Sequence, residues 1–413
     1  MENFVLKDNL RHRAYSFPKT VLNFYKTGDK PDEKNDVLYV NGVKTPYEIL
    51  PEKDGYILKT IADLPYDSER NFTFKKGENN YKPLGNDNGI IAVESIKGGL
   101  YSVKSSFGVN FIYSIETELK KISETEENLG GAIESIFIKT LKFAGGKEYK
   151  FTLKLKRDLD YLEIYEEMKG FCENEAKLVI LWENFEPLQR YTTYRGKEKI
   201  DDYTDENGKM PFVINPFMPC NSAWDRPMLA YIAKGGEWVG ILLHDYKNFD
   251  DGEYAIWGSH DTLALIPYEN KIEAQIKQGN RAFMHILSNS RAVEELETHY
   301  ARYYSAACLD KVKDYVLDWE DDKNEYPKYF SVKKDTKWGG FYGDFIGKPA
   351  AEDMMNILDR DSTIFTKPEF VAPVSCRAFR STWAQVFDLT ARELTDDEFK
   401  RVRAAMAFIC YTY

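Results

Sequence analysis

Apolar and polar residues alternate over short segments through roughly the first 290 residues of the chain. Such segments occur, among others, at 37–44, 55–61, 89–96, 107–115 and 132–143. Alternation with a period of two is typical of a half-buried strand, and clusters of Gly, Asn and Asp between the segments mark turns. Asn-Gly at 41–42 and Gly-Gly at 145–146 predict hairpins. Turn signals at this spacing favour a large two-sheet antiparallel domain over βαβ units.

The periodicity becomes helical near Ser290. Apolar residues in 291–318 recur at helical spacing, and glutamates cluster near the start, where a helix dipole favours acidic side chains. We expect 291–328 to be a helical linker and 329–413 to be α-helical. Thr395 and Glu398 have the spacing of a capping box at the start of the last helix.

The expected domain division is an N-terminal part of the β region at 1–130, its remainder at 131–290, and the two helical parts. The last helix ends at Tyr413 in an apolar run. This pattern indicates an incomplete helical region, or a helical partner that covers the last helix. The alternative is that the helix docks on its own domain.

Composition narrows the classes of partner. The chain has 413 residues and a formal charge of −11, which argues against nucleic acid or an anionic membrane as the main partner. The five cysteines are scattered and lack metal-ligand spacing, which indicates free thiols in a reducing compartment. No signal peptide or long apolar span is present in the sequence, so we expect a cytoplasmic protein unless a leader was removed. Phosphate-loop, serine-elbow and zinc-helix motifs are absent from the sequence, and we expect no cofactor and no metal.

Candidate binding residues lie between Leu178 and Asp261, which hold four of the seven tryptophans. The run from Tyr191 to Asp225 is expected to be a long irregular loop between two apolar strands, and such loops often carry binding groups. Trp224, Asp225 and Arg226 are adjacent at its end. A ring can stack on a sugar face, and a guanidinium matches the carboxylate of a uronate. A packed ring beside a surface ion pair is an equally strong alternative.

Further candidates follow in the same stretch and in the expected linker helix. Trp257 and His244 are candidates for substrate binding, and His260 for acid or base catalysis. A structural role is the more common outcome for a single histidine beside an apolar strand. His299, Arg302 and Tyr303 are three or four residues apart, so that one helix face can carry them. We expect His299 and Tyr303 to be catalytic and Arg302 to bind substrate, unless this face is an aromatic stripe that packs on the sheet.

Two groups of segments resemble known sugar-processing enzymes. Val40–Ile49 and Ala62–Tyr66 look like the short β modules of such enzymes, and Ser375–Trp383 and Leu394–Ile409 look like the first hairpin of an (α/α) toroid. The order of regions resembles the galactose-mutarotase-like supersandwich joined to a toroid in heparinase II/III-like polysaccharide lyases and related glycoside hydrolases. The resemblance implies a mainly β chain: a large antiparallel β-supersandwich followed by a helical C-terminal region that begins a toroid.

The expected function is that of the N-terminal part of a carbohydrate-active enzyme, either a polysaccharide lyase or a glycoside hydrolase. The β domain would form one wall of a cleft for an oligo- or polysaccharide. The alternative is a non-catalytic glycan-binding or assembly module. The sequence leaves open the sugar, the linkage and the choice between hydrolysis and elimination.

Overall fold

The computed structural model describes 3–9, 11, 17–65, 67–185, 187–194, 197–202, 212–214, 228–233, 238–242, 263–268 and 271–288, and further along the chain 309–310, 313, 323–326, 329, 331–335, 337–338, 345–361 and 384–412. The chain divides into two compact units. The first combines Met1–Asn79 with Glu297–Tyr413, and the second is Asn80–Leu296. The second unit is therefore inserted in the sequence of the first. The four-part division expected from the sequence stays a prediction.

Two small antiparallel sheets form the N-terminal part of the first unit. Their strand orders are β1-β7-β3-β4 and β2-β6-β5. The strands are β1 (Phe4–Lys7), β2 (Phe17–Lys26), β3 (Asp36–Val40), β4 (Val43–Thr45), β5 (Tyr47–Glu52), β6 (Gly55–Leu64) and β7 (Glu69–Lys76). The buried rings of Phe24 and Phe72 meet edge to face with centroids 5.2 Å apart, so the two sheets share a core. Asn41 and Gly42, both at positive φ, form the expected turn between β3 and β4.

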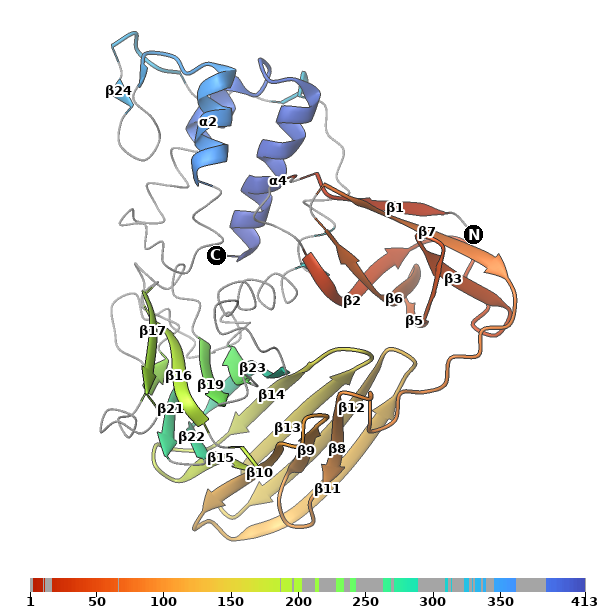
Figure 1. Cartoon of the computed structure of the whole chain (residues 1–413), viewed down its shortest axis with the longest axis vertical. Coiled ribbons are helices and arrows are strands. Elements are labelled where there is room, and N and C mark those ends of the chain that lie inside the picture. Colours follow the sequence, from red (N-terminus) through yellow and green to blue (C-terminus); the bar gives the residue numbers. More distant parts are fainter. Residues whose placement is uncertain are drawn as a thin grey trace. The chain divides into compact units, whose positions relative to one another are not determined.

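The longer helices lie in the C-terminal part of the first unit, as expected. Helix α2 spans Ala351–Asp361, residues 384–390 are helical, and α4 spans Asp396–Thr412. Figure 1 shows α2 beside α4. A short hairpin of β24 (Lys337–Trp338) and β25 (Phe345–Ile346) precedes them. The helices confirm a helical C-terminal region, whereas most of the expected helical linker at 291–328 lies outside the described residues, and continuation into a toroid stays a prediction.

The start of α4 has the capping box that the sequence indicates. The Glu398 N–H donates to Thr395 Oγ1 at 3.2 Å, and the Thr395 N–H donates to Glu398 Oε2 at 2.8 Å. Phe399, which is 1% exposed, stacks on Phe387 with ring centroids 5.4 Å apart. The first turns of α4 are thus packed within their own unit. Side chains beyond Met406 lie outside the described ones, and a partner for that end stays a prediction.

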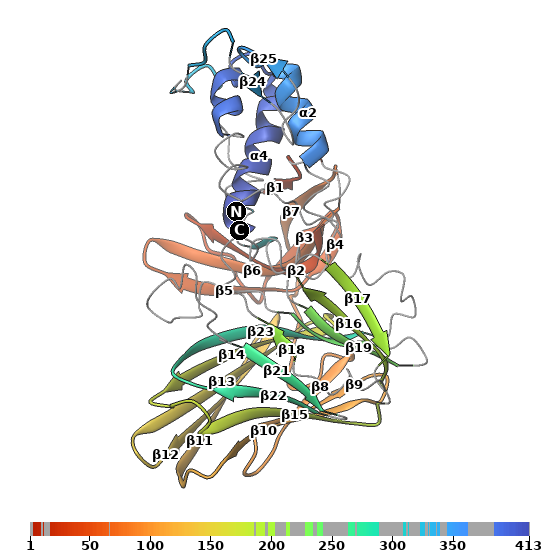
Figure 2. The same cartoon turned by 90° about the vertical axis from the view of Figure 1, so that its left-hand side faces the viewer.

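The second unit is a sandwich of two large antiparallel sheets, layered in Figure 2. The seven-stranded sheet has the order β18-β21-β22-β15-β10-β9-β8, with β8 (Ile91–Ser95), β9 (Tyr101–Ser105), β10 (Asn110–Thr117), β15 (Ala176–Glu183), β18 (Phe212–Ile214), β21 (Leu263–Tyr268) and β22 (Lys271–Ile276). The nine-stranded sheet has the order β11-β12-β13-β14-β23-β20-β19-β16-β17, with β11 (Lys121–Gly130), β12 (Glu134–Phe143), β13 (Lys147–Lys156), β14 (Tyr161–Lys169), β16 (Pro187–Tyr194), β17 (Lys197–Asp202), β19 (Met228–Ala233), β20 (Trp238–Leu242) and β23 (Gly279–Ser288).

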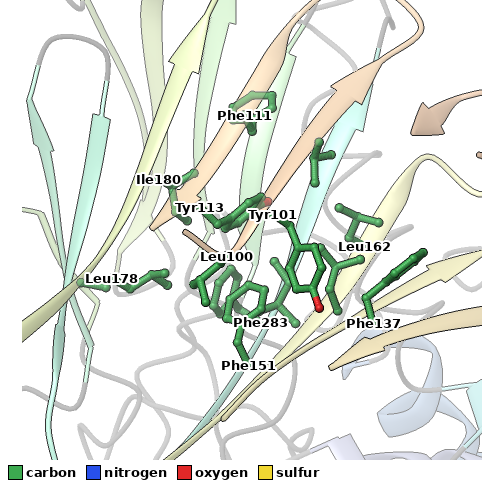
Figure 3. Close-up of a cluster of buried hydrophobic side chains, with 14 of the residues drawn as sticks. Leu100, Tyr101, Phe111, Tyr113, Phe137, Phe151, Leu162, Leu178, Ile180 and Phe283 are labelled. Carbon is green, nitrogen blue, oxygen red and sulfur yellow. The ribbon is translucent and has the colours of Figure 1, made fainter. Parts of the chain in front are cut away.

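An aromatic-rich core fills the space between these sheets. Alternate residues of β13 illustrate its origin: Tyr149, Phe151, Leu153 and Leu155 are fully buried, whereas the residues between Tyr149 and Leu155 are partly exposed. Tyr113 of β10 approaches Phe151 with centroids 5.6 Å apart, which joins the two layers. Figure 3 shows this cluster of rings and aliphatic side chains. The described chain is thus mainly β with its longer helices near the C-terminus, as the sequence indicates.

One expectation about the loop is wrong. The run from Tyr191 to Asp225 was expected to be irregular, but β16 and β17 pair as a hairpin across 187–202, and β18 lies within the run as well. The reason is local: Tyr191, Thr192, Thr193 and Tyr194 are good strand formers, and the glycine at position 196 follows them closely. Charged residues in β17 hide the alternation that would identify a strand.

Candidate functional site

The residues suggested by the sequence for catalysis and binding all lie outside the described residues. They are Trp224, Asp225, Arg226, His244, Trp257, His260, His299, Arg302 and Tyr303. The proximity of these residues in the folded chain therefore stays a prediction. Six of them belong to two segments, which we call the tryptophan segment (215–227) and the histidine segment (243–262). The strands at the ends of both segments are described.

Two strand pairs hold the ends of these segments. In the seven-stranded sheet β18 pairs with β21, and Ile214 lies opposite Leu263. In the nine-stranded sheet β19 pairs with β20, and Met228 lies opposite Leu242. The tryptophan segment runs from Ile214 to Met228, and the histidine segment runs from Leu242 to Leu263. Both segments therefore link the same two strand pairs, β18 with β21 in one sheet and β19 with β20 in the other.

A buried ammonium group lies beside the turn between β8 and β9. Lys139 of β12 is fully buried, and its Nζ lies 2.9–3.1 Å from four acceptor oxygens, namely Ser95 Oγ and the carbonyl oxygens of Ile96, Gly99 and Leu100. The carboxylates of Glu124 and Glu126, from β11, lie 3.3 and 3.6 Å from the same nitrogen. We call these six oxygen-bearing residues and Lys139 the Lys139 cage.

The carboxylate of Glu124 does not have the electrostatics of the acid in a hydrolytic pair. Hydrolysis of a glycosidic bond needs one carboxyl group with a raised pKa as the acid. Hydrogen bonding to Lys121, with a further contribution from Lys139, instead lowers the pKa of Glu124. Glu126 accepts a hydrogen bond from Ser95 Oγ at 2.6 Å. The arrangement keeps the Glu124 carboxylate ionised, which is typical of a cluster of ionic groups with a structural role.

A second ionic group lies inside the sandwich. Arg281 of β23 and Glu166 of β14 are both fully buried and form a two-pronged ion pair, in which Arg281 Nη2 donates to Glu166 Oε1 at 2.6 Å and Nε donates to Oε2. Tyr149 Oη also donates to Glu166 Oε1 at 2.6 Å, and Arg281 Nη1 donates to the Gln275 carbonyl at 2.9 Å. Every charged oxygen of Glu166 is therefore paired, as a buried carboxylate requires.

A histidine forms a polar link between the two layers. His285 Nδ1 of β23 is hydrogen-bonded to Tyr113 Oη of β10, and the ring of Phe111 packs on the same imidazole with centroids 4.6 Å apart. Burial lowers the pKa of His285 to about 3 and raises that of Tyr113 well above its usual value. A histidine that is neutral at physiological pH and enclosed between sheets suits packing rather than proton transfer to a substrate.

These buried polar residues share a sequence signal that motif patterns do not contain. Each occupies the apolar phase of an alternating strand. Lys139 follows the phase of Phe137 and Leu141, Glu166 that of Leu162 and Ile164, and Arg281 and His285 that of Phe283 and Leu287. A charged residue in that phase must find a partner inside the sandwich, which the phase alone could have indicated.

A metal site and a membrane-spanning helix are both absent from the described residues. No group of three or more His, Cys, Asp or Glu side chains in that part of the chain could hold a metal ion. No helix there is both long and apolar enough to cross a membrane.

Comparison with known proteins gives distant structural likenesses. No family model and no curated protein matches the sequence. A glycosyl hydrolase family 38 protein from Enterococcus faecalis is similar with 11% identity and a TM-score of 0.45, over 74% of this chain and 46% of that chain. An α-mannosidase from Enterococcus faecalis V583 has 11% identity and a TM-score of 0.43, over 74% and 45%. The α-N-acetylgalactosaminidase NagBb from Bifidobacterium bifidum has 8% identity and a TM-score of 0.37, over 52% and 37%. The chain spans less than half the length of each of these three proteins, and the TM-scores are too low to transfer an activity.

Proposed function

We propose that this chain is part of a carbohydrate-active enzyme, a glycoside hydrolase or a polysaccharide lyase that acts on an oligo- or polysaccharide. In this proposal the sandwich of the second unit forms one wall of the substrate cleft. The observation that carries the proposal is the pair of shared strand ends, Ile214 with Leu263 and Met228 with Leu242. The shared ends support a common location for the tryptophan and histidine segments in this proposal.

Chain geometry limits how far apart the key residues of these segments can be. Arg226 precedes Met228 by two residues, and His244 follows Leu242 by two. Two residues span at most about 7 Å. Paired Cα atoms in an antiparallel ladder are about 5 Å apart. The Cα atoms of Arg226 and His244 can therefore be no more than about 19 Å apart, which would allow both side chains to contact one oligosaccharide.

The residue types in the two segments fit a saccharide. The indole rings of Trp224 and Trp257 would stack on the apolar faces of sugar rings. Arg226 would pair with a uronate carboxylate or with hydroxyl groups, and Asp225 would accept hydrogen bonds from hydroxyls. His244 would bind the substrate beside them, and His260 would act as acid or base near neutral pH.

The expected linker helix would supply the residues for elimination. His299, Arg302 and Tyr303 combine a base, a group that neutralises a carboxylate and an acid at helical spacing. Elimination therefore requires a uronate substrate, whereas hydrolysis does not. Turnover of a neutral glycan would thus exclude elimination, whereas both enzyme classes can act on a uronate-rich glycan.

The test is turnover by the 413-residue chain over neutral and uronate-rich glycans. A reducing-sugar assay detects both reactions, and ultraviolet absorbance detects the unsaturated product of elimination alone. We expect weak turnover, which His260→Ala, His299→Ala or Tyr303→Phe lowers further. Binding without turnover on any glycan would instead favour the non-catalytic module. The absence of both binding and turnover with every glycan would contradict the enzyme as well as the non-catalytic module.

A further inference from the structure

The Lys139 cage holds more oxygen atoms than a lysine can use. Six oxygens lie between 2.9 and 3.6 Å from Nζ. An ammonium group has only three N–H donors. The surplus of acceptors is typical of the oxygen shell around a cation, in which backbone carbonyls replace water.

The turn that supplies the carbonyls has its own internal support. The Gly99 N–H donates to the Ile96 carbonyl at 3.2 Å, and the Ile96 N–H donates to the Leu100 carbonyl at 3.1 Å. Gly98 has a φ of 82°, a conformation that a side chain disfavours. The Leu100 N–H is also bonded, to the Tyr113 carbonyl at 3.0 Å. These backbone hydrogen bonds hold the carbonyl oxygens of the turn close together, and none of them involves Lys139.

The cage also needs a positive charge. Glu124 and Glu126 both face the nitrogen, and Lys121 binds the other oxygen of Glu124, Oε2, at 2.6 Å. Without Lys139 the carboxylate of Glu126 would lose its nearest charged partner among the described contacts. Four contacts near 3 Å are too long for calcium at about 2.3–2.6 Å or magnesium at about 2.0–2.1 Å, and they match N–H···O hydrogen bonds.

We propose that the Lys139 cage is a binding site for a monovalent cation of ammonium size, and that the chain fills it with its own side chain. Lys139 thereby joins β12 to the turn between β8 and β9 and makes this part of the sandwich independent of dissolved cations. Removal of the side chain would convert the cage into a site for free ammonium or potassium. This inference stands apart from the proposed carbohydrate function.

The test is thermal unfolding of the full-length Lys139→Ala variant in chloride salts at equal ionic strength. Loss of a buried charge partner predicts a fall in Tm of about 10 °C in choline chloride. Ammonium chloride and potassium chloride should return at least about 3 °C of that loss in a saturable way. Sodium and lithium should return less, because their ions are smaller than the cage.

Matched controls isolate the cage. The wild-type chain and Lys104→Ala, which removes a half-exposed lysine from β9, should show no difference between ammonium and choline. Lys139→Met should be less stable than wild type and should respond less to ammonium than Lys139→Ala, because its chain partly fills the vacated space. If Lys139→Ala folds only in ammonium or potassium, the proposal holds. Equal Tm values for this variant in all salts, or failure to fold in every salt, would overturn it.

Discussion

The ion pair of Arg281 and Glu166 shows how a buried residue depends on its partner. Both side chains are fully buried, and the carboxylate also accepts a hydrogen bond from Tyr149. Removal of both charges at such a place is often tolerated, but removal of one leaves an uncompensated charge in a medium of low polarity. The pair joins β14 to β23, and its net contribution to stability is expected to be small compared with the cost of removing one partner.

This reasoning gives a prediction for a double-mutant cycle. Arg281→Met should lower the free energy of unfolding by about 3–5 kcal/mol, because Glu166 stays buried without its cation. Glu166→Leu combined with Arg281→Met should recover most of that loss, since no charge remains. Urea denaturation of the wild type, both single variants and the double variant measures the coupling. Additive losses would show that the two residues act independently.

His285 gives a prediction about pH. Burial lowers its pKa to about 3 in the folded chain, from 6.5 for an ordinary histidine. Between these values the unfolded chain binds a proton at this position and the folded chain does not. The contribution of His285 to stability is therefore complete above pH 6.5 and is lost as the pH falls from 6.5 toward about 3, by up to about 1.4 kcal/mol per pH unit.

The control for that prediction is His285→Gln, which cannot titrate. The difference in free energy of unfolding between the wild type and this variant should shrink as the pH falls from 7 to 4, measured by urea denaturation. A difference that stays constant over this range would mean that His285 is protonated in the folded chain or exposed to solvent.

At the scale of single residues, the sequence could predict which side chains are buried better than it could predict the groups that bind them. The alternation in β12, β14 and β23 assigns Lys139, Glu166 and Arg281 to the buried face. It cannot say which groups meet them, because Lys139 is bound by a turn of the opposite sheet and Glu166 by two neighbouring strands. Those contacts depend on strand order, which a single sequence does not contain.

The capping box is the clearest prediction at the scale of an element. Thr395→Ala should lower the free energy of unfolding of the first unit by about 1 kcal/mol, because the Glu398 N–H loses its acceptor. Thr395→Ser keeps the hydroxyl oxygen and should stay near the wild type. Chemical denaturation followed by far-ultraviolet circular dichroism measures both. An equal loss in the two variants would mean that the methyl group, not the cap, matters.

Strands and hairpins were predictable where alternation and a turn signal coincide. The hairpins at Asn41–Gly42 and Gly145–Gly146 satisfy both conditions and are present. The hairpin of β16 and β17 was missed because its second strand is dominated by charges. Hydrophobic periodicity is informative only for strands with a buried face, so polar strands need another signal.

At the scale of the whole molecule, the second unit is inserted between the two parts of the first. Each unit has its own buried residues, so each should unfold as a separate cooperative transition. Differential scanning calorimetry of the intact chain should resolve two transitions. Arg281→Met should lower the Tm of one, and Thr395→Ala that of the other. A single transition that both substitutions lower would contradict two independent units.

The sequence could predict the fold class but not the arrangement of the chain. The β-rich first part and the helical end follow from periodicity, whereas the return of 297–413 to the N-terminal sheets does not. That return rests on contacts such as Asp310 Oδ1, which accepts a hydrogen bond from the Asn23 N–H at 2.6 Å. Likewise the candidate residues could be grouped by type, but the register of β18 with β21 and of β19 with β20, on which the proposed common location of six of them rests, could not be predicted.

Isothermal titration calorimetry of the intact chain with an oligosaccharide panel tests the central claim most directly. We expect weak binding to at least one glycan, since a few ring and hydrogen-bond contacts give modest affinity after ordering costs. Trp224→Ala and Arg226→Ala should each weaken it at least about tenfold, equivalent to about 1.4 kcal/mol. Trp338→Ala, which removes a tryptophan from the β24–β25 hairpin of the other unit, should leave it unchanged. Binding that survives Trp224→Ala and Arg226→Ala, or no binding to any glycan, would contradict a saccharide site on the sandwich.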